Sequence, residues 1–375
     1  MKFLLIAGFP DSLIEFRGEL IRALVEAGLD VHVACPSIHQ IKGLRDQIDN
    51  LGATTHEITL QRTGVNPLYD IRTLFDLWAL MRKIKPDYVL GYTIKPVIYG
   101  GLAGWLARVR MRSSLITGLG YAFQNDSHSR RKAILNRLVR WLYGFTLRRS
   151  QLIFFQNPDD EALFRSNKIL SSSTRSVVVS GSGVDISRFA PKPLPRKLTF
   201  LLIARLLGSK GVREYIEAAQ FIKKLDPAVS FKLVGWIDIN PDAIEQQELD
   251  AWISSGVVEY LGRMKDVRPA IENSSVFVLP SYREGTPRTV LEAMAMGRAI
   301  ITTDAPGCRE TVIDRDNGFL VPIKSVESLI LAMKEFVSDP GLASRMGERS
   351  RHIAVERYDV HKVNAVMLRE MGIPG

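Results

Sequence analysis

SVFVLPSYREGTPRTVLEAMAMG, residues 275–297, contains the pattern that decides the fold of this chain. Its first part, residues 275–281, is a short and almost wholly apolar run, which is typical of a strand buried on both faces of a parallel sheet. After a short loop, Thr286 is placed to be a helix N-cap and Pro287 to be the first helical residue. Because a strand that leads through a loop into a helix is the repeating unit of parallel α/β sheets, the segment predicts an α/β fold.

The same alternation of short apolar runs and helical patterns continues in both directions along the chain. Further strand candidates are residues 198–205, 231–236, 258–262 and 298–304 in the second half, and 2–8, 30–35, 87–92, 113–117 and 151–156 in the first. The alternation pauses at GVDISRFAPKPLPRK, residues 183–197, which contains three prolines. We therefore predict two doubly wound Rossmann-like domains facing a cleft. The expected parts are a first domain at 1–185, a linker at 186–197, a second domain at 198–355, and a C-terminal helix at 356–375 that packs back towards the first domain.

Composition places the 375 residues among ordinary globular proteins, with 46% hydrophobic and 24% charged residues. The formal net charge of +10 indicates an anionic partner. The two cysteines, Cys35 and Cys308, lie far apart, so no disulfide framework is expected and a reducing compartment fits. The opening MKFLLIAGFP meets Pro10 and Asp11 after a short run, which favours a buried first strand over a signal peptide. No stretch reaches the ~18 apolar residues of a membrane span, so we expect a soluble or peripheral protein.

Two glutamates flank the start of the helix that follows residue 287. Glu284 lies in the loop before the helix, and Glu292 lies about two turns away inside it. Backbone N–H groups at the start of a helix have no intrahelical partner and suit a phosphate, so we expect those of Arg288, Thr289 and Val290 to point outward. One carboxylate could then reach a sugar and the other a ribose, with a diphosphate between them.

The segment EGTPRTVLEAMAMG resembles the E-x7-E motif of the retaining glycosyltransferases of family 4, which have the GT-B fold. The resemblance implies that Glu284 contacts the sugar of a nucleotide diphosphate donor and that Glu292 contacts the nucleotide ribose. It also assigns Gly285, Thr289 and Val290 to the donor site. The implied mechanism retains the anomeric configuration: the leaving phosphate oxygen helps to deprotonate the acceptor hydroxyl, and no enzymic nucleophile is required.

Basic residues in other loops match further parts of the family pattern. Arg205 and Lys210 in ARLLGSKG match the basic pair that holds the leaving diphosphate, where a cation stabilises the developing charge. Arg263 in LGR matches the loop beside the base, and GCRE at residues 307–310 matches a G-x-x-E turn. DRD at residues 314–316 is interpreted as a turn, so we expect neither an essential metal nor a cofactor. No histidine is assigned a catalytic role, because GLGYAF at residues 118–123 has none where many family members carry one.

The acceptor site is predicted in the first half, after two strands. GYTIKPVIYGG at residues 91–101 puts Thr93 and Lys95 at a helix start, and TGLGYAF at residues 117–123 brings Tyr121 to the next strand end. These motifs resemble the family 4 subgroup that extends saccharides on polyprenyl diphosphate carriers, including N-acetylhexosaminyltransferases. The resemblance implies a nucleotide sugar donor, best a UDP-linked N-acetylhexosamine, and a polyprenyl-diphosphate saccharide acceptor.

Residues 101–150 contain ten lysines and arginines but a single acid, Asp126. Within residues 133–145 the apolar Ile134, Leu138, Trp141, Leu142 and Phe145 share one helical face. A basic amphipathic helix with aromatic residues indicates contact with an anionic membrane surface, although a helix packed in the core is the alternative. The expected location is cytoplasmic and peripheral, at the inner face of the cell membrane.

Three other functions are compatible with parts of the sequence. One alternative is a mannosyl- or rhamnosyltransferase that uses a GDP donor on a similar lipid, and another is a soluble transferase with a free sugar acceptor. The basic stretch alone would suit a nucleic-acid-binding protein, but no recognition motif accompanies it and we expect no nucleic acid partner. A nicotinamide dehydrogenase is disfavoured because no GxGxxG follows either first strand.

Overall fold

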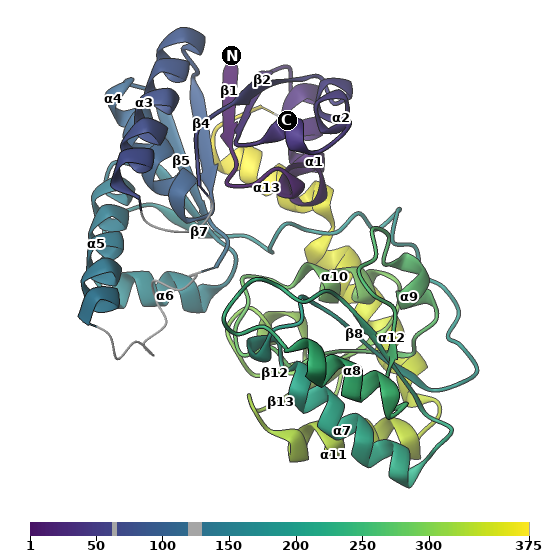
Figure 1. Ribbon diagram of the computed structural model, residues 1–375. Coiled ribbons are helices and arrows are strands. Elements are labelled where there is room, and N and C mark those ends of the chain that lie inside the picture. Colours follow the sequence, from purple (N-terminus) through teal and green to yellow (C-terminus); the bar gives the residue numbers. More distant parts are fainter. Residues whose placement is uncertain (62–65, 119–129, 375) are drawn as a thin grey trace. The chain divides into compact units, whose positions relative to one another are not determined.

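The computed structural model describes residues 1–61, 66–118 and 130–374, and its contacts divide the chain into two compact units (Figure 1). The first unit consists of Met1–Ser182 with His361–Gly375, and the second of Gly183–Val360. The division thus falls after residues 182 and 360, whereas the sequence placed boundaries at 185, 197 and 355. Each unit is built on one parallel sheet with helices on both faces. The predicted fold class, two doubly wound α/β domains, is confirmed.

The first unit contains a seven-stranded sheet in the order β3-β2-β1-β4-β5-β6-β7, and all its neighbouring strands are parallel. The strands are β1 (Lys2–Ile6), β2 (Asp30–Cys35), β3 (Ala53–Glu57), β4 (Tyr88–Tyr92), β5 (Met111–Ile116), β6 (Leu152–Phe155) and β7 (Ser176–Val178). The chain builds outward from β1 to β3 and then returns to the other side of β1. The order therefore reverses between β1 and β4, which makes this pair the switch point of the sheet.

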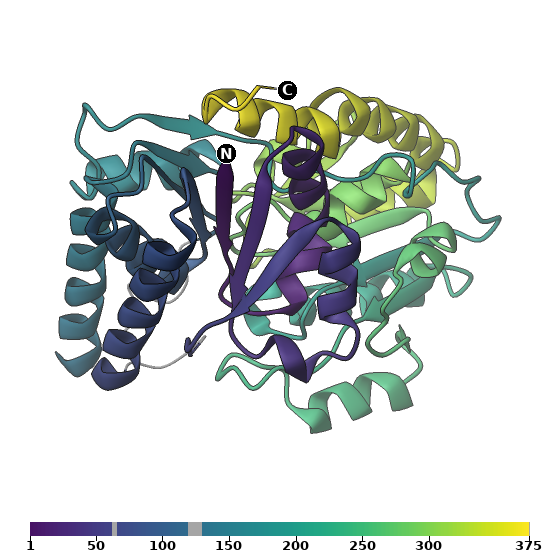
Figure 2. The ribbon, with the colours of Figure 1, turned by 90° about the horizontal axis from the view of Figure 1, so that it is seen from above.

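Helices cover both faces of the first sheet because its strands are apolar on both sides (Figure 1 and Figure 2). Phe3 and Leu5 of β1 pack on one side, and Leu4 and Ile6 pack on the other. The first side is covered by α1 (Asp11–Glu26), α2 (Leu44–Asn50) and α13 (Val360–Glu370). The second side is covered by α3 (Pro67–Ile84), α4 (Gly101–Leu106), α5 (Arg130–Leu147) and α6 (Pro158–Ser166).

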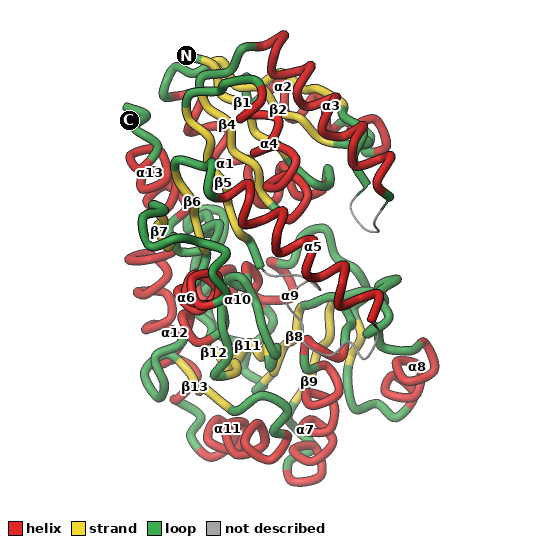
Figure 3. Tube along the Cα trace, turned by 90° about the vertical axis from the view of Figure 1, so that its left-hand side faces the viewer, coloured by secondary structure: helices red, strands yellow, loops and turns green. Residues whose placement is uncertain are grey.

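The second unit contains a six-stranded parallel sheet in the order β10-β9-β8-β11-β12-β13. Its strands are β8 (Thr199–Ile203), β9 (Ser230–Val234), β10 (Glu259–Tyr260), β11 (Val276–Leu279), β12 (Ala299–Thr303) and β13 (Gly318–Val321). Phe200 and Leu202 face one layer, and Leu201 and Ile203 face the other. The first layer includes α7 (Val212–Leu225), α8 (Gln246–Ser254) and α11 (Val326–Ser338), and Figure 3 shows α7 and α11 together on one side of the strands. The second includes α9 (Arg268–Glu272) and α10 (Arg288–Ala295), while α12 (Leu342–Ile353) contributes to both.

The strands that the sequence did not predict, β3, β7 and β13, all lie at the edge of a sheet. β3 reads ATTHE and leaves most of its side chains at least partly exposed, so it has no continuous apolar run. Central strands such as β1 and β11, in contrast, bury nearly every side chain. β3 therefore lacks the apolar run that the prediction used, because an edge strand needs less apolar surface than a central one. β7 (SVV) and β13 (GFLV) are apolar but span only three and four residues.

Two arginines attach the proline-rich segment 186–197 to the second unit. Arg298 is fully buried and donates hydrogen bonds to the carbonyl oxygens of Lys192 (2.9 Å) and Pro193 (3.3 Å), and to those of Ile271 and Glu272 in α9. Arg351 donates to the carbonyl oxygens of Ile186, Phe189 and Ala295. Burial lowers the pKa of the Arg298 guanidinium to about 10, so it is still protonated at neutral pH. The segment expected to be a linker thus has its backbone carbonyls paired within the second unit.

No helix in the described parts of the chain combines the length and the apolar character that crossing a bilayer requires.

Replacing Arg298 by alanine should lower the free energy of unfolding of the full chain by about 3 kcal/mol, because four carbonyl oxygens lose their donor. Urea denaturation followed by circular dichroism measures the change. Arg349→Ala is the matched control, because it removes an exposed ion pair with Asp316 and should cost less than about 1 kcal/mol. Equal losses in the two variants would show that the buried arginine does not hold the segment.

Candidate functional site

The candidate site in the second unit lies at the switch point of its sheet. The strand order reverses between β8 and β11, and loops that follow such adjacent parallel strands meet at the carboxyl edge. Gly211, in the loop after β8, has φ +71°, and a Cβ there would lie 2.2 Å from the Pro280 carbonyl oxygen after β11. The Tyr282 N–H donates to the Ser209 carbonyl oxygen at 2.9 Å. The two loops are thereby fixed against each other, and only glycine permits this approach.

Lys210 and Glu284 form an ion pair between these two loops. Their side chains are 17% and 15% exposed, so the pair is accessible but largely shielded from water. Ser281 donates its hydroxyl to Oε1 of Glu284 at 2.7 Å. The sequence had placed both charged residues in the donor site, and the structure brings them into direct contact.

A third loop, after β12, supports Glu284 from the other side. The Glu284 N–H donates to the Pro306 carbonyl oxygen at 2.9 Å. Gly307 has φ +81°. A Cβ on it would lie 2.2 Å from the backbone carbonyl oxygen of Glu284 and 2.6 Å from that of Gly285. Burial, followed by the charge of Glu284, raises the pKa of the neighbouring Cys308 thiol to about 12, so this thiol stays protonated and is a poor nucleophile.

The helix that follows the Glu284 loop, α10, begins one residue later than the sequence indicated. Thr286 was expected to be the N-cap, but the structure has Pro287 in that role, with extended backbone (φ −73°, ψ 109°), and Arg288 as the first helical residue. The Val290 N–H donates to the Pro287 carbonyl oxygen at 3.0 Å, and the Val290 side chain is fully buried in the core. The expectation that all three N–H groups point outward is therefore wrong for Val290, because a tight first turn uses that donor.

The remaining donor-site candidates also have partners. Glu292 is 6% exposed, and its Oε1 lies 2.8 Å from Nε of Arg288, one helical turn earlier. The Thr289 hydroxyl donates to the carbonyl oxygen of Ile203 at the end of β8, at 3.3 Å. Arg205 forms an ion pair with Asp238 at 2.8 Å, whereas Lys210 pairs with Glu284, so the two cations have different carboxylate partners. The Arg263 guanidinium carbon lies 4.5 Å from the centre of the Trp236 ring.

In the first unit, two of the predicted acceptor residues, Thr93 and Lys95, lie after β4, at the switch point between β1 and β4. Thr93 has φ +69°, and its hydroxyl would be 2.6 Å from a Cβ on Gly8, which follows β1. Nζ of Lys95 lies 2.8 Å from Oδ1 of Asp70 in α3, and the two side chains are 13% and 12% exposed. The pKa of the Tyr99 hydroxyl is raised, mainly by burial and to a smaller extent by the negative charge of Asp70. Tyr121, the third acceptor candidate, lies outside the described residues.

The sequence prediction missed the partners that orient these charged side chains. Arg288 has a detectable signal, because it stands four residues before Glu292 in a helix. Asp70, Asp238 and Ser281 have none, since the first two lie 25 and 33 residues from their partners and serine at a strand end is common.

The described residues include no group of three or more His, Cys, Asp and Glu side chains arranged to hold a metal ion. The motif DRD, which the sequence analysis interpreted as a turn, does reverse the chain. Arg315 has φ +63°, and its N–H donates to the Gly318 carbonyl oxygen at 2.8 Å.

Two family models match the chain. Residues 15–180 match the glycosyl transferase 4-like domain, and residues 184–353 match the glycosyl transferases group 1. The two matches coincide closely with the two structural units.

Two bacterial relatives align with most of the chain. The N,N'-diacetylbacillosaminyl-diphospho-undecaprenol alpha-1,3-N-acetylgalactosaminyltransferase of Campylobacter jejuni is 28% identical over 93% of this chain and 92% of its own length. The UDP-Gal:alpha-D-GlcNAc-diphosphoundecaprenol alpha-1,3-galactosyltransferase of Escherichia coli is 28% identical over 85% of this chain and 83% of its own length.

Solved structures with the same fold include two of interest. A sucrose-phosphate synthase from Thermosynechococcus elongatus has a TM-score of 0.78 at 19% identity, over 99% of this chain and 98% of that one. HepE from Anabaena, in complex with UDP and glucose, has a TM-score of 0.77 at 18% identity, over 99% of both chains. At these identities the likeness establishes the fold alone. Together with the matched domains and the relatives along nearly its whole length, it leads to one conclusion: the chain belongs to the family 4 type of glycosyltransferases, with a glycosyl transferase 4-like domain followed by a group 1 domain.

Proposed function

We propose that this glycosyltransferase moves an N-acetylhexosamine from a UDP donor to a polyprenyl-diphosphate-linked saccharide, with retention of configuration and without an essential metal. The observation that carries the proposal is the ion pair between Lys210 and Glu284 at the switch point of the second sheet. It joins a cation suited to a diphosphate with a carboxylate suited to sugar hydroxyls.

The contacts of the second unit support a donor that lies across the start of α10. Lys210 would exchange its carboxylate partner for the diphosphate, which leaves Glu284 to accept hydrogen bonds from the donor sugar. Glu292, held by Arg288 inside the helix, would accept from the ribose hydroxyls. The aromatic and guanidinium groups of Trp236 and Arg263 provide a surface against which the base would stack. The backbone of Gly285, the N–H of Thr289 and Arg205 would complete the donor contacts.

The chemistry requires no group to be covalently modified. The acceptor hydroxyl oxygen forms a bond to the anomeric carbon of the sugar, while the bond from that carbon to the diphosphate oxygen breaks on the same face. The bonding electrons go to the leaving diphosphate, and one of its oxygens takes the hydroxyl proton. Lys210 and Arg205 stabilise the negative charge that develops on the leaving group. The buried, protonated Cys308 next to Glu284 takes no part.

The acceptor assignment is supported by the two relatives, whose names specify diphospho-undecaprenol saccharides as the molecules they extend. In this chain Lys95, Thr93 and Tyr121 are the candidates to hold the acceptor. Lys95 is paired with Asp70 and mostly shielded from water, so it too would exchange a carboxylate for a diphosphate. UDP is favoured over GDP because the Escherichia coli relative uses UDP-Gal and HepE was solved with UDP.

A surface of the first unit supports peripheral binding at an anionic membrane. The layer formed by α3, α4 and α5 exposes large apolar side chains that belong to all three helices. They are Leu68, Ile71, Phe75, Trp105, Leu106, Leu138 and Trp141. Basic side chains are exposed on the same helices and beside them, namely Arg72, Arg82, Lys83, Arg108, Arg110, Arg137 and Arg148. We call these two sets the apolar-basic surface.

The apolar-basic surface bears on the two explanations of the helix at 133–145. Trp141 is 57% exposed and Leu138 is 48% exposed, whereas Tyr143 and Leu147 pack in the core. The side of α5 that carries Trp141 therefore does not serve the core. Exposed aromatic side chains beside arginines are typical of helices that lie in a membrane interface. The proposed location is the cytoplasmic face of the cell membrane, where lipid-linked acceptors would be presented.

Glu284→Gln should chiefly lower kcat, and Glu292→Gln should chiefly raise KM for the nucleotide sugar. Losses of roughly ten- to several hundred-fold are expected, because each variant removes a charged contact. Steady-state kinetics with UDP-N-acetylhexosamine and a diphosphate-linked acceptor measure both constants. Glu259→Gln, in an ion pair with Lys232 away from the site, should leave both constants unchanged. Near-normal kinetics in both site variants would remove the donor assignment.

Turnover should be insensitive to EDTA, whereas Lys210→Ala and Arg205→Ala should each lower kcat on the order of a hundredfold, since cationic side chains take the role of a metal. Lys232→Ala is the matched control, because it also breaks an ion pair in the second unit and should have little effect. Activity that is lost in EDTA and restored by magnesium would contradict the proposal.

Replacing Phe75 and Trp141 by serine should weaken binding to anionic phospholipid vesicles even at high salt, because it removes apolar insertion. Replacing Arg137 and Arg148 by serine should weaken binding at low salt by roughly fivefold per residue, because each basic side chain contributes ~1 kcal/mol. Vesicle sedimentation measures both effects. Phe221→Ser, which changes another exposed aromatic residue, in the second unit, serves as control. Wild-type protein that stays in the supernatant would refute the membrane proposal.

A further inference from the structure

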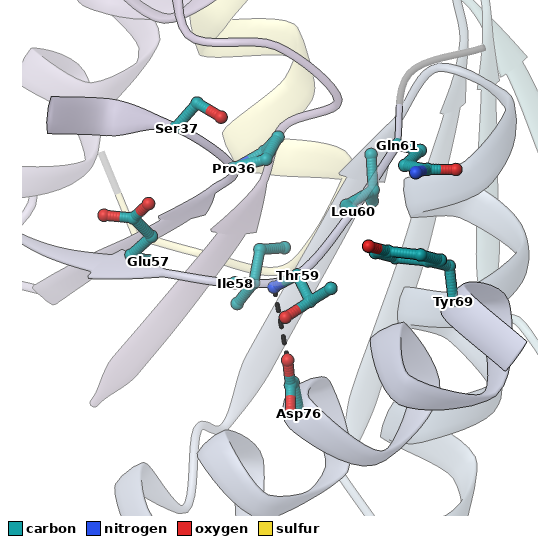
Figure 4. Close-up of a pocket in the computed structure, with 9 residues that line it drawn as sticks. All are labelled: Pro36, Ser37, Glu57, Ile58, Thr59, Leu60, Gln61, Tyr69 and Asp76. Carbon is teal, nitrogen blue, oxygen red and sulfur yellow. Dashed lines mark hydrogen bonds between the residues drawn. The ribbon is translucent and has the colours of Figure 1, made fainter. Parts of the chain in front are cut away.

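A groove of about 320 Å³ lies in the first unit, where β2 and β3 end (Figure 4). Its walls come from the loop after β2, the end of β3 with the loop that follows it, and one side of α3. None of the described donor-site or acceptor-site candidates is among the residues that line this groove. Its position at the carboxyl edge of a doubly wound sheet is one where ligands commonly bind.

The groove lining combines carboxylates, neutral polar groups and one exposed aromatic ring. Glu57 and Asp76 supply the carboxylates, and Thr59 and Gln61 supply a hydroxyl and an amide. Tyr69 is 43% exposed, and its ring stands at one side of the groove in Figure 4. Among the described residues that line it, none is lysine or arginine. The carboxylates of Glu57 and Asp76 favour a neutral polyhydroxyl ligand over an anionic one, because they accept hydrogen bonds from its hydroxyl groups.

Local hydrogen bonds hold these groups in place before any ligand binds. Oδ2 of Asp76 accepts from the Thr59 N–H at 3.2 Å, which fixes the loop after β3 to α3 (Figure 4). Oε2 of Glu57 lies 2.9 Å from Nδ1 of His39. The carboxylates are therefore oriented, and a ring with polar edges and an apolar face could lie on Tyr69 while its hydroxyls reach them.

Helix α3 connects the groove to the predicted acceptor residues. Tyr69 lines the groove, and its neighbour in the chain, Asp70, binds Lys95. The strand order β3-β2-β1-β4 puts the groove three strand spacings, about 14 Å, from the end of β4. The saccharide of an acceptor whose diphosphate binds Lys95 can therefore continue along the carboxyl ends of the strands.

We infer that this groove is a subsite for a neutral sugar unit of the acceptor, with Tyr69 as the stacking surface and Glu57 and Asp76 as hydrogen-bond acceptors. The inference rests on the proposed function, because it takes the acceptor to be a saccharide. The subsite adds affinity for the acceptor and does not take part in bond breaking.

The direct test is binding of free sugars to the full-length protein without donor, measured by saturation-transfer NMR. The probes are N,N'-diacetylchitobiose, as a neutral saccharide, and N-acetylglucosamine 1-phosphate, as an anionic one. The neutral probe should bind, and Tyr69→Ala should weaken it about tenfold, which corresponds to the loss of one aromatic contact. The isosteric Asp76→Asn should weaken it less but detectably, and the phosphate should bring no gain. Phe221→Ala, with a similar exposed area in the second unit, should leave binding unchanged.

Kinetics separate this inference from the proposed function. With a short-chain diphosphate-linked disaccharide, Tyr69→Ala should raise the acceptor KM five- to tenfold and leave kcat and donor hydrolysis by water unchanged. No binding of the neutral probe, or equal effects of Tyr69→Ala and Phe221→Ala, would overturn the subsite while transfer activity persists. Absence of both transfer and donor hydrolysis in the wild type would instead overturn the proposed function, even if the neutral probe binds.

Discussion

Parallel strand pairing is the constraint on which both units depend. Every neighbouring pair in the two sheets is parallel. After each strand the chain must therefore return to the end of the sheet at which the next strand begins. The loops after all strands therefore gather at one edge, where residues distant in sequence become neighbours. Lys210 and Glu284 lie 74 residues apart and still form an ion pair, because β8 and β11 are adjacent. The same geometry brings Gly8 against Thr93 in the first unit.

Paired charge is the common feature of the proposed donor and acceptor residues. Lys210, Arg205 and Lys95 each have a carboxylate partner, and all three pairs are at least half shielded from water. An unpaired charge in such a place would be costly, so each partner stabilises the free protein. If these residues bind a diphosphate as proposed, the same partner would be displaced or rearranged, and Asp70, Asp238 and Glu284 would then contribute to the affinity for the ligand.

The first unit presents two surfaces of opposite character. The apolar-basic surface on α3, α4 and α5 suits anionic lipid, while the groove beside Tyr69 is lined, in the part of the chain that the structure describes, by two carboxylates and by neutral side chains. Helix α3 contributes to both, through Phe75 on its exposed side and Asp76 next to it. Under the proposed function, one surface would face the membrane that carries the lipid, and the other would hold a neutral sugar of the saccharide attached to it.

The fold class, the central strands and the glycosyltransferase family could be predicted from the sequence, because buried strands and the glutamate pair around a helix start leave local signals. It missed the edge strands β3, β7 and β13: ATTHE in β3 contains no continuous apolar run, and the apolar runs of β7 (SVV) and β13 (GFLV) are very short. It also placed the start of α10 one residue early, since proline suits both the N-cap and the first helical position. Three features came from the tertiary structure alone. They are the pairing of acids with bases, the attachment of residues 186–197 to Arg298 and Arg351, and the exposure of the Trp141 side of α5. These features depend on contacts between residues far apart in the chain, and a local pattern contains no information about such contacts.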